Sequence, residues 1–551
     1  MRSPSSIAAL SCVLSTLLAC GPATAGSGAG APSRIEHGAD RVVISRFTHI
    51  TDVAVTQRFT FVASETGVAT FDRLLQSWMP PVGEPERGPL RRVLGVAAHP
   101  LDDAAWIIEP GAIVYFEPTL GWSLRTTIVG NVDGILFDRR DPQGGIFVRS
   151  LGRWMRLTPT GVAVPVSATE LPPPEARLAP TTFEELARRR PALRSARLLT
   201  RDPSMRSWDP SAADEAPEGG EIWLGTWGYG VFRVEPEFLR AVHEPYGLLE
   251  RGAGALAPTV DGVWIAGLGD PRASGEGLVF ASTDLRDWVW QVPGIASGLA
   301  GAESRAIALR GRRAWIGTDR GAVRLELDGA PLPRTLTSAH GLPSDDVLAM
   351  LPRLDGLWIG TSRGLVFVRE QWEEPPAAPQ IIGETTLSGS AVHGIIAVGD
   401  TLWLASDAGL LLLGAGGTRA PVRIGSAARD ARLSRRMVAI ASSDSVVAVA
   451  SDSEVLLLHA STGALLDVPA AANVRSVGVP SALAIDGRTL WIGGPRGVIA
   501  VDRETGASRA LSVPGDLPGR VHDIALSEVV AWIATDEGVV RLRRFAGGLP
   551  R

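Results

Sequence analysis

A short hairpin pattern recurs along this chain: an apolar run with a tryptophan, a threonine or serine, two polar residues, a glycine and a second apolar run. The clearest copies read GLWIGTSRGL at residues 356–365, RAWIGTDRG at 313–321 and TLWIGGPRG at 489–497, with variants at 402–409 and 531–538. Two apolar strands joined by a short turn that contains glycine are typical of a tight β-hairpin. The pattern therefore predicts an all-β chain.

The hairpins follow one another at a regular spacing. Aligned on their aromatic position, they occur at Phe61, Trp106, Phe147, Trp223, Trp264, Trp315, Trp358, Trp403, Val447, Trp491 and Trp532. A period of about 44 residues is that of a four-stranded propeller blade. We predict a β-propeller of about eleven four-stranded repeats over residues 41–545. Since propellers usually have about four to eight blades, one large ring and two smaller rings are both open.

One unit shows the expected parts in order. Residues 340–346 read HGLPSDD, residues 347–351 are an apolar run suited to the innermost strand, and the hairpin around Trp358 follows. We expect Trp358 to pack between neighbouring blades and Gly364 to take the positive φ that its turn needs. The unit resembles the two-component regulator propeller repeat, whose pattern is GLP-S-x-x-V, a short strand and LWIGT-x-x-GL. This resemblance implies a propeller fold and extracytoplasmic sensing.

Some segments depart from the repeat. An insertion at about 160–220 contains TFEE at 182–185, a capping box that predicts a short helix ended by Pro191. The insertion either projects from the propeller or marks a junction between rings. The loop at 268–276 is longer than the equivalent turns, and residues 282–288 are similar to the Asp-box turn of sialidase-type propellers. Residues 41–46 predict an extra strand, which would remove an exposed edge by pairing with the last hairpin.

The N-terminus predicts export. Residues 1–19 have a positive start and a short apolar run, which is typical of a signal peptide. LLAC at 17–20 resembles the lipobox of bacterial lipoproteins, which implies that Cys20 becomes the lipidated first residue. Ordinary secretion, with cleavage after Ala25, is the alternative. Cys12 lies inside the signal, so no disulfide forms within the mature chain. Residues 20–40 are small and Gly/Ala-rich, and we expect them to be a flexible tether.

Composition excludes several functions. The formal net charge is −5, so no global field favours nucleic acid, and beyond the lipid anchor we expect no membrane contact. All 54 basic residues are arginine. Chemistry that needs a lysine amine, such as a Schiff base or a P-loop, is therefore excluded. This arginine bias fits a GC-rich genome, so arginine patches are weak evidence for anion recognition.

Candidate chemistry is confined to one position of the repeat. His393 and His522 each follow the valine that opens an inner strand, and Asp523 follows His522; Arg305, Asp133 and Thr51 occupy this position in other units. If the position faces a central channel, these groups gather at one mouth. The alternative is that each is a solvated channel residue of its own blade. The histidines lack the spacing of metal ligands, so we expect no metal and no cofactor.

Nucleophiles are few. No GxSxG elbow lies between a strand and a helix, and the only tyrosines are Tyr115, Tyr229 and Tyr246. Trp227 and Tyr229 lie in one hairpin turn and are either an exposed recognition point or packing residues. The catalytic residues are therefore predicted as none, and the ligand-binding residues are unknown.

We expect a non-enzymatic propeller tethered to the bacterial envelope, which binds a protein or glycan partner as a scaffold or sensory module. Rigid repeats with variable loops suit that role. The chain stops after its last repeat, so we expect it not to signal alone. The alternative is a propeller-type carbohydrate lyase or hydrolase with its site at the channel mouth.

Overall fold

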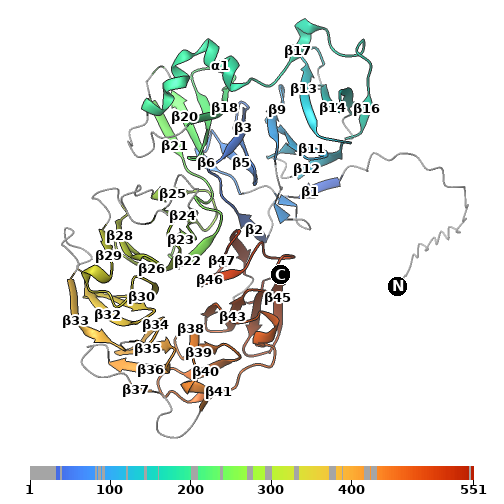
Figure 1. Ribbon diagram of the computed structural model, residues 1–551. Coiled ribbons are helices and arrows are strands. Elements are labelled where there is room, and N and C mark those ends of the chain that lie inside the picture. Colours follow the sequence, from blue (N-terminus) through green and yellow to red (C-terminus); the bar gives the residue numbers. More distant parts are fainter. Residues whose placement is uncertain are drawn as a thin grey trace, which may run out of the picture.

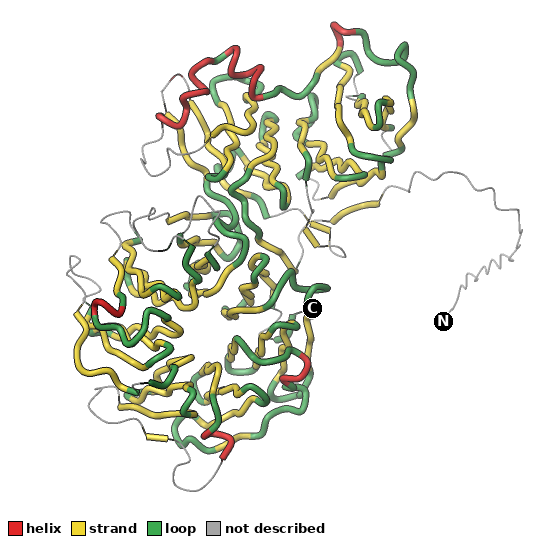
Figure 2. The backbone as a smooth tube through the Cα atoms, in the orientation of Figure 1, coloured by secondary structure: helices red, strands yellow, loops and turns green. Residues whose placement is uncertain are grey.

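The computed structural model confirms the all-β fold class. It describes residues 33–36, 40–80, 83–84, 88–89, 93–118, 122–141, 145–158, 161–199, 209–235, 237, 240–269, 277–291, 299, 301–327, 334–370, 380–387, 389–414, 422–423, 431–544 and 548–550. These residues form eleven antiparallel sheets of four or five strands and one two-stranded sheet (Figure 1). The few helical turns lie outside the sheets (Figure 2).

Seven sheets form a ring, which Figure 1 shows around a central opening. Each inner strand contacts the next in the order β22, β26, β30, β34, β38, β42 and β46, and β46 contacts β22. The sheets consist of β22 (Ala253–Pro258), β23 (Gly262–Gly267), β24 (Leu278–Ser282) and β25 (Trp288–Gln291); β26 (Ser304–Arg310), β27 (Arg313–Thr318), β28 (Gly321–Glu326) and β29 (Arg334–Leu336); β30 (Val347–Arg353), β31 (Gly356–Thr361), β32 (Gly364–Arg369) and β33 (Gln380–Thr386); β34 (Val392–Val398), β35 (Thr401–Ser406), β36 (Gly409–Gly414) and β37 (Val422–Arg423); β38 (Met437–Ser442), β39 (Val446–Ser451), β40 (Val455–His459) and β41 (Leu465–Leu466); β42 (Ala482–Ile485), β43 (Thr489–Gly494), β44 (Gly497–Asp502) and β45 (Ser508–Ser512); and β46 (Val521–Leu526), β47 (Val530–Thr535), β48 (Gly538–Arg543) and β2 (Arg41–Ile44). Short 3-10 turns precede three inner strands: η6 (Ser338–His340), η7 (Ala431–Ser434) and η8 (Val474–Ser476).

The last sheet of the ring takes its fourth strand from the start of the chain. β2 pairs antiparallel with β48, with Arg41 opposite Leu542 and Ile44 opposite Val539. This is the pairing that the sequence suggested for residues 41–46. It occupies the hydrogen-bonding edge of β48 that would otherwise face solvent.

The other four sheets form a second group. They consist of β3 (Ile50–Val55), β4 (Phe59–Ser64), β5 (Gly67–Asp72) and β6 (Ser77–Trp78); β9 (Gly95–Ala98), β10 (Ala105–Glu109), β11 (Ala112–Glu117), β12 (Trp122–Thr127) and β1 (Ser33–Glu36); β13 (Val132–Asp138), β14 (Ile146–Ser150), β15 (Arg153–Leu157), β16 (Ala163–Pro165) and β17 (Arg177–Leu178); and β18 (Asp209–Glu215), β19 (Ile222–Trp227), β20 (Val231–Glu235) and β21 (Arg240–Glu244). β7 (Gly83–Glu84) and β8 (Gly88–Pro89) form the two-stranded sheet. Inner strand β3 contacts both β9 and β18, so the last sheet of this group packs against its first.

The insertion covers a sheet of the second group. As predicted, Thr182 caps helix α1 (Phe183–Arg189) in a capping box with Glu185. The 3-10 segment η2 (Pro191–Leu199) then begins at Pro191, and η1 (Pro174–Ala176) precedes β17. Buried side chains of α1 and η2 pack on one face of the β18–β21 sheet, in a cluster formed by Leu186, Leu193, Ala196, Ala213, Leu224 and Phe232. The other face of the sheet packs in the cluster that contains residues of β3, through Ala212, Trp223 and Val231. The described part of the insertion therefore packs on this sheet and does not project from it.

The hairpin unit has the local structure that its sequence predicts. Trp358 is buried in a cluster with Val392 and Ile395 of the neighbouring sheet. Gly364 has a φ of 147°, a conformation that side chains with a Cβ rarely adopt. Trp358 and Gly364, the most regular residues of the repeat, are therefore packing and turn residues.

The N-terminal segment differs from the prediction in one respect. Residues 20–40 were expected to be a tether, yet β1 within that stretch pairs antiparallel with β12. β12 is the outer strand of its sheet, and its free hydrogen-bonding edge accepts another strand. The predicted signal peptide (1–19) and Cys20 lie outside the described residues.

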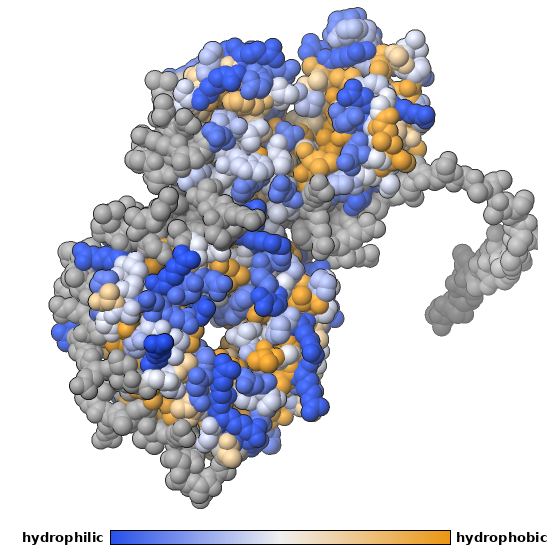
Figure 3. Space-filling view, viewed as in Figure 1, coloured by the Kyte–Doolittle hydropathy of each residue, from blue (hydrophilic) through white to orange (hydrophobic). Residues whose placement is uncertain are grey.

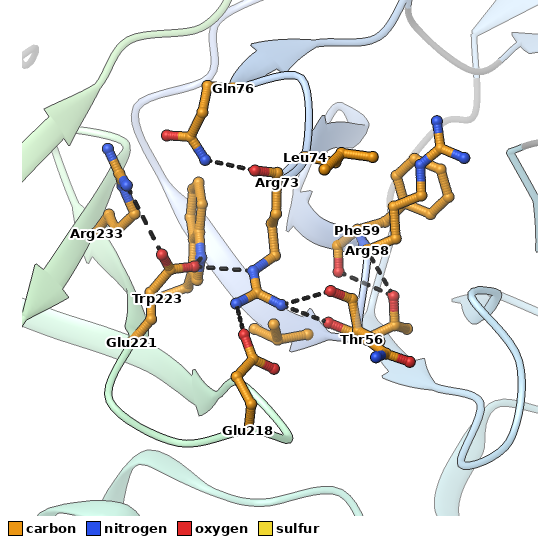
Figure 4. A network of polar contacts seen from close by, with 12 residues as sticks. Thr56, Arg58, Phe59, Arg73, Leu74, Gln76, Glu218, Glu221, Trp223 and Arg233 are labelled. Atoms are coloured by element: carbon orange, nitrogen blue, oxygen red, sulfur yellow. Dashed lines mark hydrogen bonds and ion pairs between the residues drawn. The ribbon is translucent and has the colours of Figure 1, made fainter.

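In two places, neighbouring sheets are joined at the end opposite their hairpin turns by a polar contact that we call the outer lock. It links the residue six positions after the hairpin glycine of one sheet to the residue two positions before the hairpin tryptophan of the sheet that precedes it around the ring or group. In Figure 4, Arg73 donates to Glu221 (2.8 Å) and to the carbonyls of Thr56 (3.0 Å) and Gln57 (2.8 Å), and Glu221 also accepts from the Trp223 indole (2.7 Å). Arg73 and Glu221 are 148 positions apart, so this lock fastens the two ends of the group.

The same lock occurs in the ring with its charges exchanged. Glu370 follows Gly364 by six positions and accepts from Arg313 (2.9 Å), from Arg324 (3.3 Å) and from the Trp315 indole (3.2 Å). The acid and the base have changed places relative to Arg73 and Glu221. The lock therefore depends on complementary charges across the seam and not on one particular residue at each position.

An aromatic cluster joins the ring to the second group. Tyr246 lies at its centre, with ring centroids 4.9 Å from Phe47, 4.6 Å from Trp78 and 5.1 Å from Trp288. The Trp78 backbone N–H donates to the carbonyl of Arg286, in the turn between β24 and β25. Because aromatic side chains bury large areas, this cluster fastens the ring firmly to the second group.

Partly buried carboxylates join neighbouring inner strands. Asp523 of β46 accepts from the N–H of Leu256 on β22 (2.8 Å), which links the last sheet of the ring to the first. In the second group, Asp214 accepts from Val55 (2.8 Å), and Asp52 accepts from Val96 (3.0 Å). Burial raises the pKa of Asp523 and of Asp214 to about 6 and that of Asp52 to about 7, although backbone N–H groups favour the ionised forms.

These carboxyls predict a loss of stability between about pH 4 and about pH 7. Their folded-state pKa lies above the unfolded value, so the folded protein retains protons that the unfolded chain releases, and stability falls as pH rises through that window. Asp523→Asn keeps an acceptor for Leu256 but cannot ionise. Between pH 5 and pH 8, we expect the free energy of unfolding of this variant to fall by about 1–3 kcal/mol less than that of the parent. Urea unfolding at both pH values measures this; an equal change in Asp400→Asn, at an exposed turn, would contradict it.

Candidate functional site at the hairpin rim

The position singled out in the sequence is a β-bulge. In nine of the described sheets the inner strand has one extra residue opposite the second strand, close to the hairpin turn between the second and third strands. The bulged residues are Thr51, Asp133, Ser211, Gly254, Arg305, Leu348, His393, Val438 and His522. A bulge re-aims the side chain that it carries. We call this end of the seven ring sheets, with its bulges and hairpin turns, the hairpin rim.

The structure divides the predicted site residues between the two groups. Arg305, His393 and His522 lie on the hairpin rim, on β26, β34 and β46, whereas Thr51 and Asp133 belong to the second group. β34 and β46 are separated in the ring by β38 and β42, so the two histidines are not on neighbouring strands. The predicted residues therefore do not all gather at one mouth.

His393 is part of a chain of polar contacts between two sheets. Its Nε2 lies 2.9 Å from Oδ1 of Asp407, in the turn between β35 and β36. Arg436, just before β38, donates to the same oxygen at 2.9 Å and lies 3.6 Å from Asp452. Burial opposes the ionisation of Asp407, but His393 and Arg436 outweigh it and hold the pKa of Asp407 below its usual range.

His522 has a different environment at the same structural position. Its Nε2 is buried and has no hydrogen-bond partner within the described part of the chain. Oδ1 of Asp536 is likewise buried and has no hydrogen-bond partner among the described residues. Asp536 instead accepts from Arg520 at 2.9 Å through its other oxygen. Burial lowers the pKa of His522 and outweighs the attraction of Asp536. His522 is therefore a neutral imidazole at pH 7.

Further ion pairs cross the seams between ring sheets at this rim. Arg251 donates to Glu537 (2.9 Å) between the first and last sheets, and Arg305 donates to Asp346 of the next sheet. Figure 3 shows hydrophilic residues gathered around the opening of the ring. Exposed ion pairs of this kind contribute little stability, so their effect is to hold a polar surface of mixed charge in place.

The other candidate residues from the sequence are the three tyrosines, Trp227 and the long loop at 268–276. Tyr229 and Tyr246 are buried, and burial raises the pKa of Tyr115 to about 12, so none of the three tyrosines is an exposed nucleophile. Trp227, by contrast, is 52% exposed. Most of the long loop, residues 270–276, lies outside the described residues. Within the described ranges, no group of three or more His, Cys, Asp or Glu is placed to hold a metal ion.

Comparisons with known proteins give fold likenesses only. No protein-family model and no curated protein matches the chain. Among solved structures, the chain is similar to the extracellular domain of BT4673 from B. thetaiotaomicron, thought to be a one component system, with 11% identity and a TM-score of 0.43, covering 95% of this chain and 84% of that one. It is also similar to the computationally designed Ika8 protein, with 14% identity and a TM-score of 0.38, covering 59% and 93%.

A second structure of the BT4673 extracellular domain, described there as part of a hybrid two component system, has 11% identity and a TM-score of 0.42, covering 91% of this chain and 71% of that one. Both BT4673 structures are of an extracellular domain. Among the described residues, none of the helices is both long and apolar enough to cross a membrane.

Proposed function

We propose that this chain is an envelope-tethered, non-enzymatic binding module that recognises a protein or glycan partner through the hairpin rim, with Cys20 as its lipid anchor. One observation supports this proposal above the others. The same bulge recurs in successive ring sheets, and it carries glycine, arginine, leucine, histidine or valine. A constant frame that presents different side chains at one repeated position suits recognition.

The rim also has the stiffness that a binding surface needs. Asp407 and Arg436 bridge two sheets, and Arg251 and Glu537 bridge two others. Side chains that are already ordered lose less conformational entropy when a partner binds. The mixture of acids and arginines favours a partner whose own surface carries both charges, because complementary charge governs specificity and association rate.

The enzyme alternative has one observation in its favour. His393 and Asp407 form the imidazole–carboxylate pair that general bases use. However, Asp407 also accepts from Arg436 through the same oxygen, which reduces the basicity of the pair. A purified protein that cleaves an oligosaccharide, and whose His393→Ala variant does not, would replace the binding proposal with this one.

Site-specific photo-crosslinking tests the binding proposal. A benzophenone side chain placed at Arg305, His393 or His522 is expected to crosslink an envelope component, because these positions lie on the hairpin rim. The control position is Leu354, which is 80% exposed in the turn between β30 and β31, at the opposite end of the sheets. Crosslinks at Leu354 that equal those at the rim, or none at any rim position, would refute the proposal.

A further inference from the structure

The turn between β19 and β20 is one residue longer than four turns of the ring. In the ring, Thr318 Oγ1 donates to the carbonyl of the residue three positions later, Gly321, at 2.9 Å; the turns opened by Thr361, Ser406 and Thr535 do the same. Thr226 Oγ1 donates instead to Gly230, four positions later, at 2.7 Å. The extra length accommodates Trp227, which follows the threonine where the ring turns have Asp319, Ser362, Asp407 or Asp536. A large apolar side chain has therefore replaced a small polar one.

Trp227 is exposed on a rigid backbone. The N–H groups of Gly228 and Gly230 both donate to the carbonyl of Thr48, at 2.8 and 3.0 Å. Between them Tyr229 is buried, and its carbonyl lies 3.0 Å from Nε2 of His243. The turn is thus fixed on three sides, and the 52% exposure of Trp227 results from this packing and not from a loose loop.

Two polar side chains flank the indole. Asp209 lies directly opposite Trp227 in the β18–β19 register and is exposed. Opposite residues of an antiparallel pair have their Cβ atoms about 4.5–5.5 Å apart and point to the same face. On the other side, His49 forms an antiparallel bridge with Trp227, and their rings meet edge to face with centroids 4.5 Å apart. A carboxylate, an indole and an imidazole thus stand in one row across three neighbouring segments.

We propose that Asp209, Trp227 and His49 form a binding subsite for a saccharide. A pyranose ring has an apolar C–H face that packs on an aromatic ring, and its hydroxyls are both donors and acceptors. A carboxylate supplies acceptors only. Nδ1 of His49 lies 2.9 Å from Oγ1 of Thr48, so when Nδ1 accepts from that hydroxyl the imidazole presents its donor at Nε2. The row therefore offers each kind of contact that a sugar needs. A cationic side chain also stacks on tryptophan, but it needs acceptors alone and makes no use of the imidazole donor.

This subsite belongs to the second group of sheets, apart from the hairpin rim of the ring. It deepens the proposed function by naming a ligand class, and it stands even if the rim binds nothing. Crosslinking at the rim and sugar binding at Trp227 are therefore independent readouts.

Titration calorimetry of the purified protein with cello-, xylo- and chito-oligosaccharides of three to six units tests the subsite. We expect at least one series to bind, with the affinity lowered tenfold or more in Trp227→Ala, threefold or more in Asp209→Asn, and less than threefold in Trp227→Phe. Leu74→Ala is the matched control, because Leu74 is 76% exposed in the same group of sheets but lies in another turn. Unchanged thermal unfolding of each variant shows that the fold is retained.

Three outcomes would overturn the proposal. No series binds to the parent protein, Trp227→Ala binds as tightly as the parent, or a hexa-arginine peptide binds in a manner that depends on Trp227 while the oligosaccharides do not. The last outcome would assign the same exposed indole to cation recognition.

Discussion

Replacing Glu370 by alanine is expected to lower the free energy of unfolding by about 3–5 kcal/mol. The Glu370 carboxylate accepts from Arg313, Arg324 and the Trp315 indole, and the side chains of Glu370 and both arginines are only 3% exposed. Deleting the acid removes the carboxylate that two buried guanidinium groups share, although Arg313 keeps its contact with Glu326 at 2.8 Å. The loss is large because water cannot replace the missing carboxylate at a buried site.

Urea unfolding followed by tryptophan fluorescence measures this effect. Glu370→Gln keeps the shape and one acceptor but removes the charge, and we expect a smaller loss than for alanine. The control is Glu303→Ala, which breaks an ion pair with Arg305 at a glutamate side chain that is 59% exposed, and here we expect a loss below about 1 kcal/mol. Similar losses for Glu370→Ala and Glu303→Ala would show that the buried contact contributes no more than a surface ion pair.

The repeating unit could be predicted from the sequence because its determinants are local. The spacing of Trp358 and Gly364 is set within one hairpin, and each residue has the burial or backbone conformation that its position requires. The capping box at Thr182 likewise depends on four consecutive residues. Local periodicity and turn chemistry are the signals that a single sequence carries most clearly.

The division into a ring of seven and a group of four could not be predicted. It depends on which inner strands touch, and all eleven units have nearly the same pattern. A signal did exist in the polar residue six positions after the hairpin glycine. Arg73 at that position has its acid partner, Glu221, far along the chain, whereas Glu370 has Arg313 in the preceding sheet. In these two cases, charge complementarity at this position identifies sheets that are neighbours.

The candidate site was predicted only in part. His393 and His522 were identified as occupying one structural position, and the structure shows that this position is a bulge. Their surroundings differ because Asp407 accepts from His393, whereas Asp536 accepts from Arg520. Trp227 was recognised as either exposed or packed, but His49 was missed because its partner lies about 180 residues away. Contacts between distant segments leave no periodic trace in one sequence.

Exchanging the charges of the outer lock in the second group is expected to restore stability that a single reversal removes. Arg73→Glu places a third acid beside Glu218 and Glu221 at a side chain that is 9% exposed, and we expect it to cost about 4 kcal/mol or more. Adding Glu221→Arg is expected to recover about 2–3 kcal/mol of this loss.

The physical reason is that the double variant recreates a contact already present in the ring. Arg233 lies opposite Trp223 in its sheet, as Arg324 lies opposite Trp315. With glutamate at 73 and arginine at 221, the acid at 73 faces two arginines and a tryptophan indole, as Glu370 does. Glu218, which is 53% exposed, remains beside it. A double-mutant cycle by urea unfolding gives the coupling energy, with Arg73→Glu combined with Glu237→Arg, outside the lock, as the control pair. The contrary result is that the exchange recovers no more stability than the control pair does. In that case, charge complementarity does not determine the strength of the lock, and the contacts of Arg73 with the backbone carbonyls of Thr56 and Gln57 do.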